Sequence, residues 1–233
     1  MIVALNNKSN LDCQEFQHYQ EELKKIETKE TLILCPTFLN LSQFSSDTIF
    51  LGSQNVSSRG NGAFTGEVSA LQLKSYGAKY AIIGHSERRE YQKESLEEIH
   101  EKLLRLLEND ITPILCIGET REEREQGKVE EVLEREILSA IQGLNEESRE
   151  RIIVAYEPIW SIGTGIIPTN QEIEEVFQFI KTFLPKSFIL YGGSANEENI
   201  DQLNQISLID GYLLGGLSLK VEKLKIFLQK LEK

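Results

Sequence analysis

Short apolar runs recur along this chain, and each ends where polar or glycine residues begin. Eight of them have the length and the enrichment in Ile, Val, Leu and Tyr that predict β-strands. These runs are Ile2 to Leu5, Thr31 to Cys35, Ile49 to Leu51, Tyr80 to Ile83, Pro113 to Ile117, Ile152 to Tyr156, Phe188 to Tyr191 and Leu208 to Leu214. Because consecutive rather than alternating positions are apolar, we expect both faces of most of these strands to be buried.

Charged segments with helical periodicity separate the runs. The periodicity is clearest at Leu96, Ile99, Leu103 and Leu106, and at Val129, Leu133, Ile137 and Ile141. Strands that are buried on both faces and alternate with helices predict parallel pairing, with the helices covering the sheet.

Eight strand and helix units in 233 residues predict a closed (β/α)8 barrel, in which eight parallel strands lie inside an outer ring of helices. The alternative is a doubly wound open sheet. Such a sheet normally carries glycines at its first strand-to-helix turn, and Ile2 to Asn10 contains none. No linker or shift in composition divides the chain, so we expect residues 1–233 to form a single barrel domain.

Composition narrows the class of function. The net charge of -12, with no cluster of Lys and Arg, argues against nucleic acid as the main partner. The chain has neither a signal-like start nor an apolar stretch near the ~20 residues of a membrane span, so we expect a soluble, cytoplasmic protein. Cys13, Cys35 and Cys116 are spaced too widely for a disulfide framework or a zinc site, and we expect Cys116 to pack in the core.

The carboxylate Glu157 follows the sixth apolar run and precedes a loop rich in proline and glycine. Pro158 prevents the strand from continuing, while Gly163 and Gly165 permit backbone angles that other residues rarely adopt. This pattern predicts a hinged lid beside Glu157. By itself the carboxylate could equally cap a helix or pair with a lysine.

In a barrel, the C-terminal ends of all the strands lie on one face, and that face carries the chemistry. The residues that follow the predicted strands therefore belong together. They are Asn6, Lys8, Gln54, His85, Glu87, Glu119, Glu157, Gly192-Gly193-Ser194 and Gly215-Gly216.

Two of these residues can stabilise negative charge. If His85 lies at a helix N-terminus, the positive end of the helix dipole favours the neutral imidazole, which can donate a proton to an oxyanion. Lys8 can polarise a carbonyl group or hold an anion, with Glu87 as its ion-pair partner. The alternatives are an ordinary hydrogen-bonded histidine and a solvated lysine.

The glycines indicate an anion site. At Gly163, Gly192-Gly193-Ser194 and Gly215-Gly216, backbone amides can approach a ligand closely, and the last two loops of a barrel often bind phosphate. A carboxylate base, a neutral electrophile, a lysine and a phosphate site suit proton abstraction beside the carbonyl group of a small sugar phosphate. No metal-binding or cofactor motif occurs, so we expect neither a metal nor an organic cofactor.

A set of longer motifs supports this interpretation. They are Asn6-x-Lys8, Gln54-Asn55-Val56-Ser57, Gly62-Ala63-Phe64-Thr65-Gly66-Glu67, Ile83-Gly84-His85-Ser86-Glu87-Arg88-Arg89, Cys116-Ile117-Gly118-Glu119, the Tyr156 to Gly165 segment, Tyr191-Gly192-Gly193-Ser194 and Gly215-Gly216. In content and order they resemble the triosephosphate isomerase family, over essentially the full length of the chain.

The resemblance implies a TIM barrel and a cofactor-free aldose-ketose isomerase, an intramolecular oxidoreductase of glycolysis and gluconeogenesis. Its substrates would be dihydroxyacetone phosphate and D-glyceraldehyde 3-phosphate, which interconvert through an enediolate. It implies that Glu157 is the base and that His85 shuttles protons between the enediolate oxygens. Asn6 and Lys8 would stabilise negative charge, and Glu87 would position Lys8.

The resemblance also implies that backbone groups near Gly163, Ser194, Gly215 and Gly216 hold the phosphate group. It further implies a homodimer, in which the loop around Thr65 reaches the neighbouring subunit near its Asn6 and Lys8.

Three features of the sequence and its length depart from the family pattern. Asn7 stands where tryptophan is common, Leu217 where a small residue is common, and Ile166-Ile167 where a polar or basic residue is frequent. The chain is also somewhat short. Two other interpretations remain open at this point: another sugar-phosphate isomerase or lyase on the same barrel, and an inactive binding or scaffold protein that keeps the fold.

Overall fold

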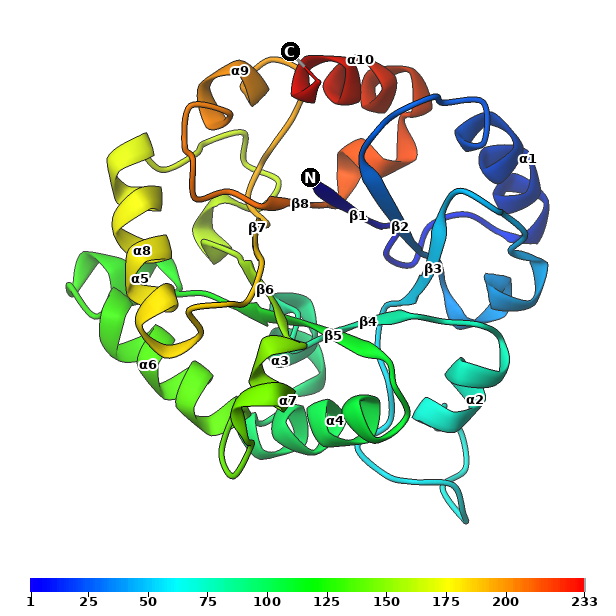
Figure 1. Ribbon diagram of the computed structural model, residues 1–233, viewed down its shortest axis with the longest axis horizontal. Helices are drawn as coiled ribbons and strands as arrows, with labels where there is room; N and C mark the ends of the chain where they lie inside the picture. The colour runs from blue at the N-terminus through cyan, green and yellow to red at the C-terminus, as the bar shows by residue number, and fades with distance from the viewer. Residues whose placement is uncertain (233) are drawn as a thin grey trace.

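The computed structural model describes residues 1–232, and its eight strands form a closed parallel barrel (Figure 1). Each strand pairs with the next along the chain, and β8 pairs with β1 to close the barrel. The strands are β1 (Ile2–Asn6), β2 (Thr31–Cys35), β3 (Phe50–Ser53), β4 (Tyr80–Ile83), β5 (Thr112–Ile117), β6 (Ile153–Tyr156), β7 (Ile189–Tyr191) and β8 (Gly211–Leu214). The predicted (β/α)8 barrel is therefore confirmed.

Helices surround the barrel (Figure 1). The α-helices are α1 (Cys13–Leu23), α2 (Ala70–Ser75), α3 (Ser86–Gln92), α4 (Leu96–Glu108), α5 (Arg121–Glu125), α6 (Val129–Ala140), α7 (Glu146–Glu150), α8 (Asn170–Phe183), α9 (Ile200–Leu203) and α10 (Val221–Leu231). Three short 3-10 helices are η1 (Phe38–Gln43), η2 (Ile159–Ser161) and η3 (Gly216–Leu219). None of the helices within residues 1–232 is long and apolar enough to cross a membrane.

Two strand boundaries differ from the prediction by two residues or more, and the other differences are of one residue. The eighth strand begins at Gly211 rather than Leu208, because the chain turns just before it and the Ile209 N–H bonds to the Ile206 carbonyl. The third strand extends to Ser53, because Gly52 and Ser53 pair with β4.

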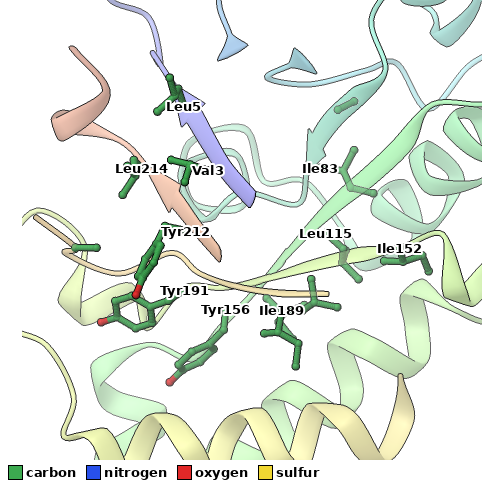
Figure 2. Close-up of a cluster of buried hydrophobic side chains, with 14 of the residues drawn as sticks. Val3, Leu5, Ile83, Leu115, Ile152, Tyr156, Ile189, Tyr191, Tyr212 and Leu214 are labelled. Atoms are coloured by element: carbon green, nitrogen blue, oxygen red, sulfur yellow. The ribbon is translucent and has the colours of Figure 1, made fainter. Parts of the chain in front are cut away.

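Alternate strand residues pack on opposite sides of the barrel wall, as the two-residue period of a strand requires. One set fills the barrel interior and includes Ala4, Ile33, Ile82, Ile114, Cys116, Ala155, Leu190 and Leu213. The other set faces the helices, and Figure 2 shows members of it, among them Tyr156, Tyr191 and Tyr212 from three neighbouring strands. Two cores thus share one sheet, which explains why the strands are apolar at consecutive positions.

The outer core fixes the helices. The Tyr156 ring packs edge-on against Phe177 of α8, with ring centroids 6.2 Å apart. On α4, the apolar positions Ile99, Leu103 and Leu106 are buried, as their spacing predicted. Because each helix returns the chain to the start of the next strand, every strand ends on the same face of the barrel.

Candidate active site

The C-terminal face of the barrel holds a cavity of about 370 Å³. Ala4 and Ala155 face the interior, so Asn6 and Glu157, two residues further along their strands, point the same way. The predicted residues that line this cavity are Asn6, Lys8, His85, Glu157, Gly163, Ser194, Gly215 and Gly216. Residues from five strand ends and the following loops therefore converge on one space.

Two residues to which the resemblance assigns a role lie elsewhere. Glu87 lines an adjoining cavity, which shares Asn6, Lys8 and His85 with the first. Thr65 lines neither cavity and lies in an exposed segment, residues 59–67, between β3 and α2. Figure 1 shows this loop (cyan) extending away from the barrel.

Glu157 is buried, with 3% of its surface exposed. One carboxylate oxygen, Oε1, lies 3.2 Å from His85 Nε2, and the other accepts a hydrogen bond of 3.3 Å from the Ser86 N–H. Glycines on both neighbouring strands make room for it. A Cβ at Gly118 would lie 1.8 Å from the Glu157 carbonyl oxygen, and one at Gly192 would lie 2.8 Å from its Cγ.

His85 is the N-cap of α3, the position that its sequence context indicated. Its ring Nδ1 accepts a hydrogen bond of 3.2 Å from the Glu87 backbone N–H. Because Nδ1 acts as the acceptor, the ring proton lies on Nε2, the nitrogen that faces Glu157. The histidine therefore presents an N–H donor to the cavity.

Lys8 has left-handed backbone geometry, with φ at 51°. This conformation is unfavourable for a residue with a side chain, so neighbouring contacts must hold it. The Lys8 N–H donates to Asn6 Oδ1 at 3.0 Å, and the Gln54 side-chain amide donates to the Lys8 carbonyl at 2.8 Å. The Lys8 Nζ pairs with Glu87 Oε1 at 2.5 Å, so the predicted ion pair forms.

The loop after Pro158 is hydrogen-bonded to the loop that follows β7. Gly163 and Gly165 have φ values of 71° and 77°, in the region that favours glycine. Ser161 Oγ donates to the Ile166 carbonyl at 2.6 Å, and Ser194 Oγ donates to the Ser161 carbonyl at 2.5 Å. No feature of the sequence pointed to Ser161, because its role depends on contact with a loop more than thirty residues away.

A buried carboxylate, that of Glu119, holds the start of the same loop in place. Glu119 accepts hydrogen bonds from the Tyr156 hydroxyl at 3.0 Å and from Trp160 Nε1 at 2.9 Å, and it pairs with Arg124 Nη1 at 3.0 Å. Burial, and then the Glu119 charge, raises the pKa of Tyr156 well above its usual value, so its hydroxyl remains a donor. Sequence reasoning placed Glu119 on the rim but missed Arg124, which follows it on a helix without a motif.

The positions that depart from the family pattern are distributed around this site. Leu217 is buried and lines the cavity. Ile166 is exposed, whereas Ile167 packs against the outer core. Asn7 is buried behind the turn that carries Lys8.

Cys116 packs inside the barrel, as predicted, and it lies close to Glu157. Burial, and then the Glu157 charge, raises the pKa of its thiol well above the usual value. Within residues 1–232, no group of three or more His, Cys, Asp or Glu side chains is arranged to hold a metal ion.

Comparison with known proteins identifies the family. The family model described as triosephosphate isomerase matches residues 1–231. Triosephosphate isomerase of Dictyoglomus turgidum is 40% identical over 236 residues, covering 94% of each chain. That of Colwellia psychrerythraea is 39% identical over 243 residues, covering 97% of this chain and 95% of its own. The chain therefore belongs to the triosephosphate isomerase family.

Proposed function

We propose that this chain interconverts dihydroxyacetone phosphate and D-glyceraldehyde 3-phosphate, with Glu157 as the base that moves a proton between two adjacent carbons. The observation that carries the proposal is the cavity in which Glu157, His85 and Lys8 meet the glycines of three loops. Family membership supplies the reaction. These side chains and backbone amides provide the groups that the reaction requires.

In the proposed reaction, Glu157 takes a proton from the carbon beside the carbonyl group of dihydroxyacetone phosphate. The electrons move into an enediolate, and the same carboxyl group returns a proton to the neighbouring carbon. The contact between Glu157 Oε1 and His85 Nε2 supports this role, since it places base and electrophile on the same side of the cavity. The substrate exchanges this contact for contacts of its own with both groups.

His85 and Lys8 stabilise the negative charge of the enediolate. The Nε2–H of His85 donates to the enediolate oxygens and moves protons between them, with the tautomer set by the Glu87 N–H. The Lys8 ammonium group and the Asn6 amide complete the stabilisation. Glu87 holds Lys8 at the edge of the cavity through their ion pair.

The phosphate group binds at the opposite side of the cavity, to backbone groups near Gly163, Ser194, Gly215 and Gly216. The loop that contains η2 closes over it. Because Ser194 and Ser161 are hydrogen-bonded, binding of phosphate at Ser194 draws the loop with it. Closure excludes water from the enediolate, which would otherwise eliminate its phosphate group.

We further propose that the chain forms one domain, works in the cytoplasm and assembles as a homodimer. The exposed loop around Thr65 supports the last point, since it extends from the barrel and carries the half-exposed Phe64. In the dimer this loop reaches the neighbouring subunit near its Asn6 and Lys8.

A coupled assay of glyceraldehyde 3-phosphate conversion tests the function. The wild type is expected to turn over, and Glu157→Gln is expected to lose at least ~100-fold in kcat, the lower limit for a positioned general base. Glu131→Gln removes the same charge from an exposed position on α6 and serves as the control. Equal rates for the wild type and Glu157→Gln would refute the assignment.

A further inference from the structure

A buried polar cluster lies behind the active-site rim, at the residue between Asn6 and Lys8. Asn7 is 1% exposed, and its side-chain amide lies 3.4 Å from the Tyr19 hydroxyl and 3.3 Å from Ser218 Oγ. Tyr19 belongs to α1 and Ser218 to η3, so the cluster joins the turn after β1 and the helix that follows it to a segment near the other end of the chain.

The direction of every hydrogen bond in the cluster is determined. The Tyr19 hydroxyl donates to the Ser218 carbonyl at 2.7 Å, and the Ser218 hydroxyl donates to the Asn6 carbonyl at 3.2 Å. Because each hydroxyl has one hydrogen and uses it on a carbonyl, both hydroxyl oxygens accept from the Asn7 amide. Burial raises the pKa of Tyr19 to about 12, so this donor does not ionise near neutral pH.

The cluster connects the two loops that hold opposite ends of the proposed substrate. Asn7 and Asn6 precede the strained turn of Lys8, while Ser218 follows Gly215 and Gly216 in the phosphate-site loop. The loops also meet at the cavity, where a Cβ at Gly215 would lie 3.1 Å from Lys8 Cε. A shift of either loop would therefore change the distance between the ammonium group and the phosphate amides.

We propose that Asn7, Tyr19 and Ser218 are positioning residues that hold the Lys8 turn and the phosphate-site loop in register. The substrate then meets the ammonium group and the phosphate amides at a fixed separation. The inference rests on the proposed function of the cavity.

The test removes one hydroxyl and leaves its ring in place. Tyr19→Phe is expected to raise the KM for glyceraldehyde 3-phosphate about three- to tenfold, the range that the loss of one buried hydrogen bond gives. Inorganic phosphate, used as a competitive inhibitor, is expected to bind the variant more weakly by a similar factor. Ser218→Ala, which deletes one small hydroxyl, is measured alongside and is expected to change both constants in the same direction.

A matched control separates positioning from stability. Tyr212 is also a buried tyrosine, and its hydroxyl bonds to Asn204 Oδ1 at 3.0 Å, outside the cluster. Tyr212→Phe is expected to lower the melting temperature as Tyr19→Phe does, and to leave KM and phosphate inhibition within twofold of the wild type.

Two results would overturn the inference. One is an unchanged KM and phosphate inhibition in both Tyr19→Phe and Ser218→Ala, and the other is an equal change in Tyr212→Phe. An inactive wild type would instead refute the proposed function, so the two failures are distinguishable.

Discussion

The position of Glu157 depends on two neighbouring glycines, which have no side chain. Gly118 and Gly192 flank it just after the ends of the adjacent strands β5 and β7, where any side chain would collide with it. The carboxylate is consequently buried and held between the His85 ring and the Ser86 N–H, rather than extended into solvent. At the scale of single residues, the site is shaped by absent side chains as much as by the groups that react.

This geometry predicts how one methyl group added at position 192 would affect the rate. A Cβ at position 192 would lie 2.8 Å from Glu157 Cγ, so Gly192→Ala is expected to displace the base. Because a misplacement of about 1 Å can lower the rate about 100-fold, we expect kcat to fall by roughly that factor. Gly60→Ala, where a Cβ meets nothing within 4 Å, is the control. An unchanged kcat in a folded Gly192→Ala protein would show that the glycine does not set the position of the base.

Among the elements, the proposed lid loop has a first part that hydrogen bonds hold in place and a tip that requires glycine. Trp160 and Tyr156 are tied to the buried Glu119, whereas Gly163 and Gly165 turn the chain through left-handed backbone angles. Hydrogen bonds to one carboxylate therefore hold the first part of the loop, whereas the tip needs residues without a Cβ.

A pair of glycine substitutions tests the tip. Gly163 and Gly143 have nearly equal φ values, 71° and 73°, and a Cβ at either meets no atom within 4 Å. Alanine at each is expected to cost about 1 kcal/mol in backbone strain, measured as a loss of stability in urea. Only Gly163→Ala is expected to lower kcat as well, by several-fold, since Gly143 lies in the distant connection between α6 and α7. Equal steady-state kinetics for the two variants would contradict the proposed role of Gly163 in the lid.

The elements that could be predicted from the sequence alone are those whose residue pattern is set within the segment itself. The strands Thr31–Cys35 and Tyr80–Ile83 were placed correctly, because burial on both faces makes them continuously apolar. The segment before Gly211 was not, because an apolar turn and an apolar strand look alike until the pairing partner is known.

The same distinction holds for the candidate site. The residues of the cavity could be predicted, since parallel strands must end together. The bond between Ser161 and Ser194 and the cluster around Asn7 could not, because they depend on how loops from different strands meet.

At the scale of the whole molecule, a protein with a net charge of -12 must bind a negatively charged substrate. Three lysines, Lys8, Lys220 and Lys223, line the cavity beside three carboxylates, Glu157, Glu197 and Glu198, so its lining has no net acidic excess. Many of the other acidic residues lie in the first turns of outer helices such as α4 and α5, where the helix dipole favours them. The charge of the surface and that of the site are therefore separate features.

The proposed homodimer is tested by the mass in solution. Light scattering at micromolar concentration is expected to give twice the mass of one chain. Phe64→Asp, in the loop that would enter the partner, is expected to shift the protein toward monomer and to lower its activity, because the charge would be buried in the interface. Leu138→Asp, at a position of similar exposure (47% against 43%) on α6, is the control. A wild type of monomer mass would refute the dimer.

The central claim is that Glu157 transfers a proton between carbon atoms, and isotope exchange tests it most directly. Dihydroxyacetone phosphate is incubated with the enzyme in deuterium oxide, and NMR follows deuterium at the carbon-bound positions of substrate and product. Because the proton held by the carboxyl group can exchange with solvent, the wild type is expected to incorporate deuterium as it turns over. Glu157→Gln is expected to do so at least ~100-fold more slowly. Incorporation by the variant at the wild-type rate would contradict the claim.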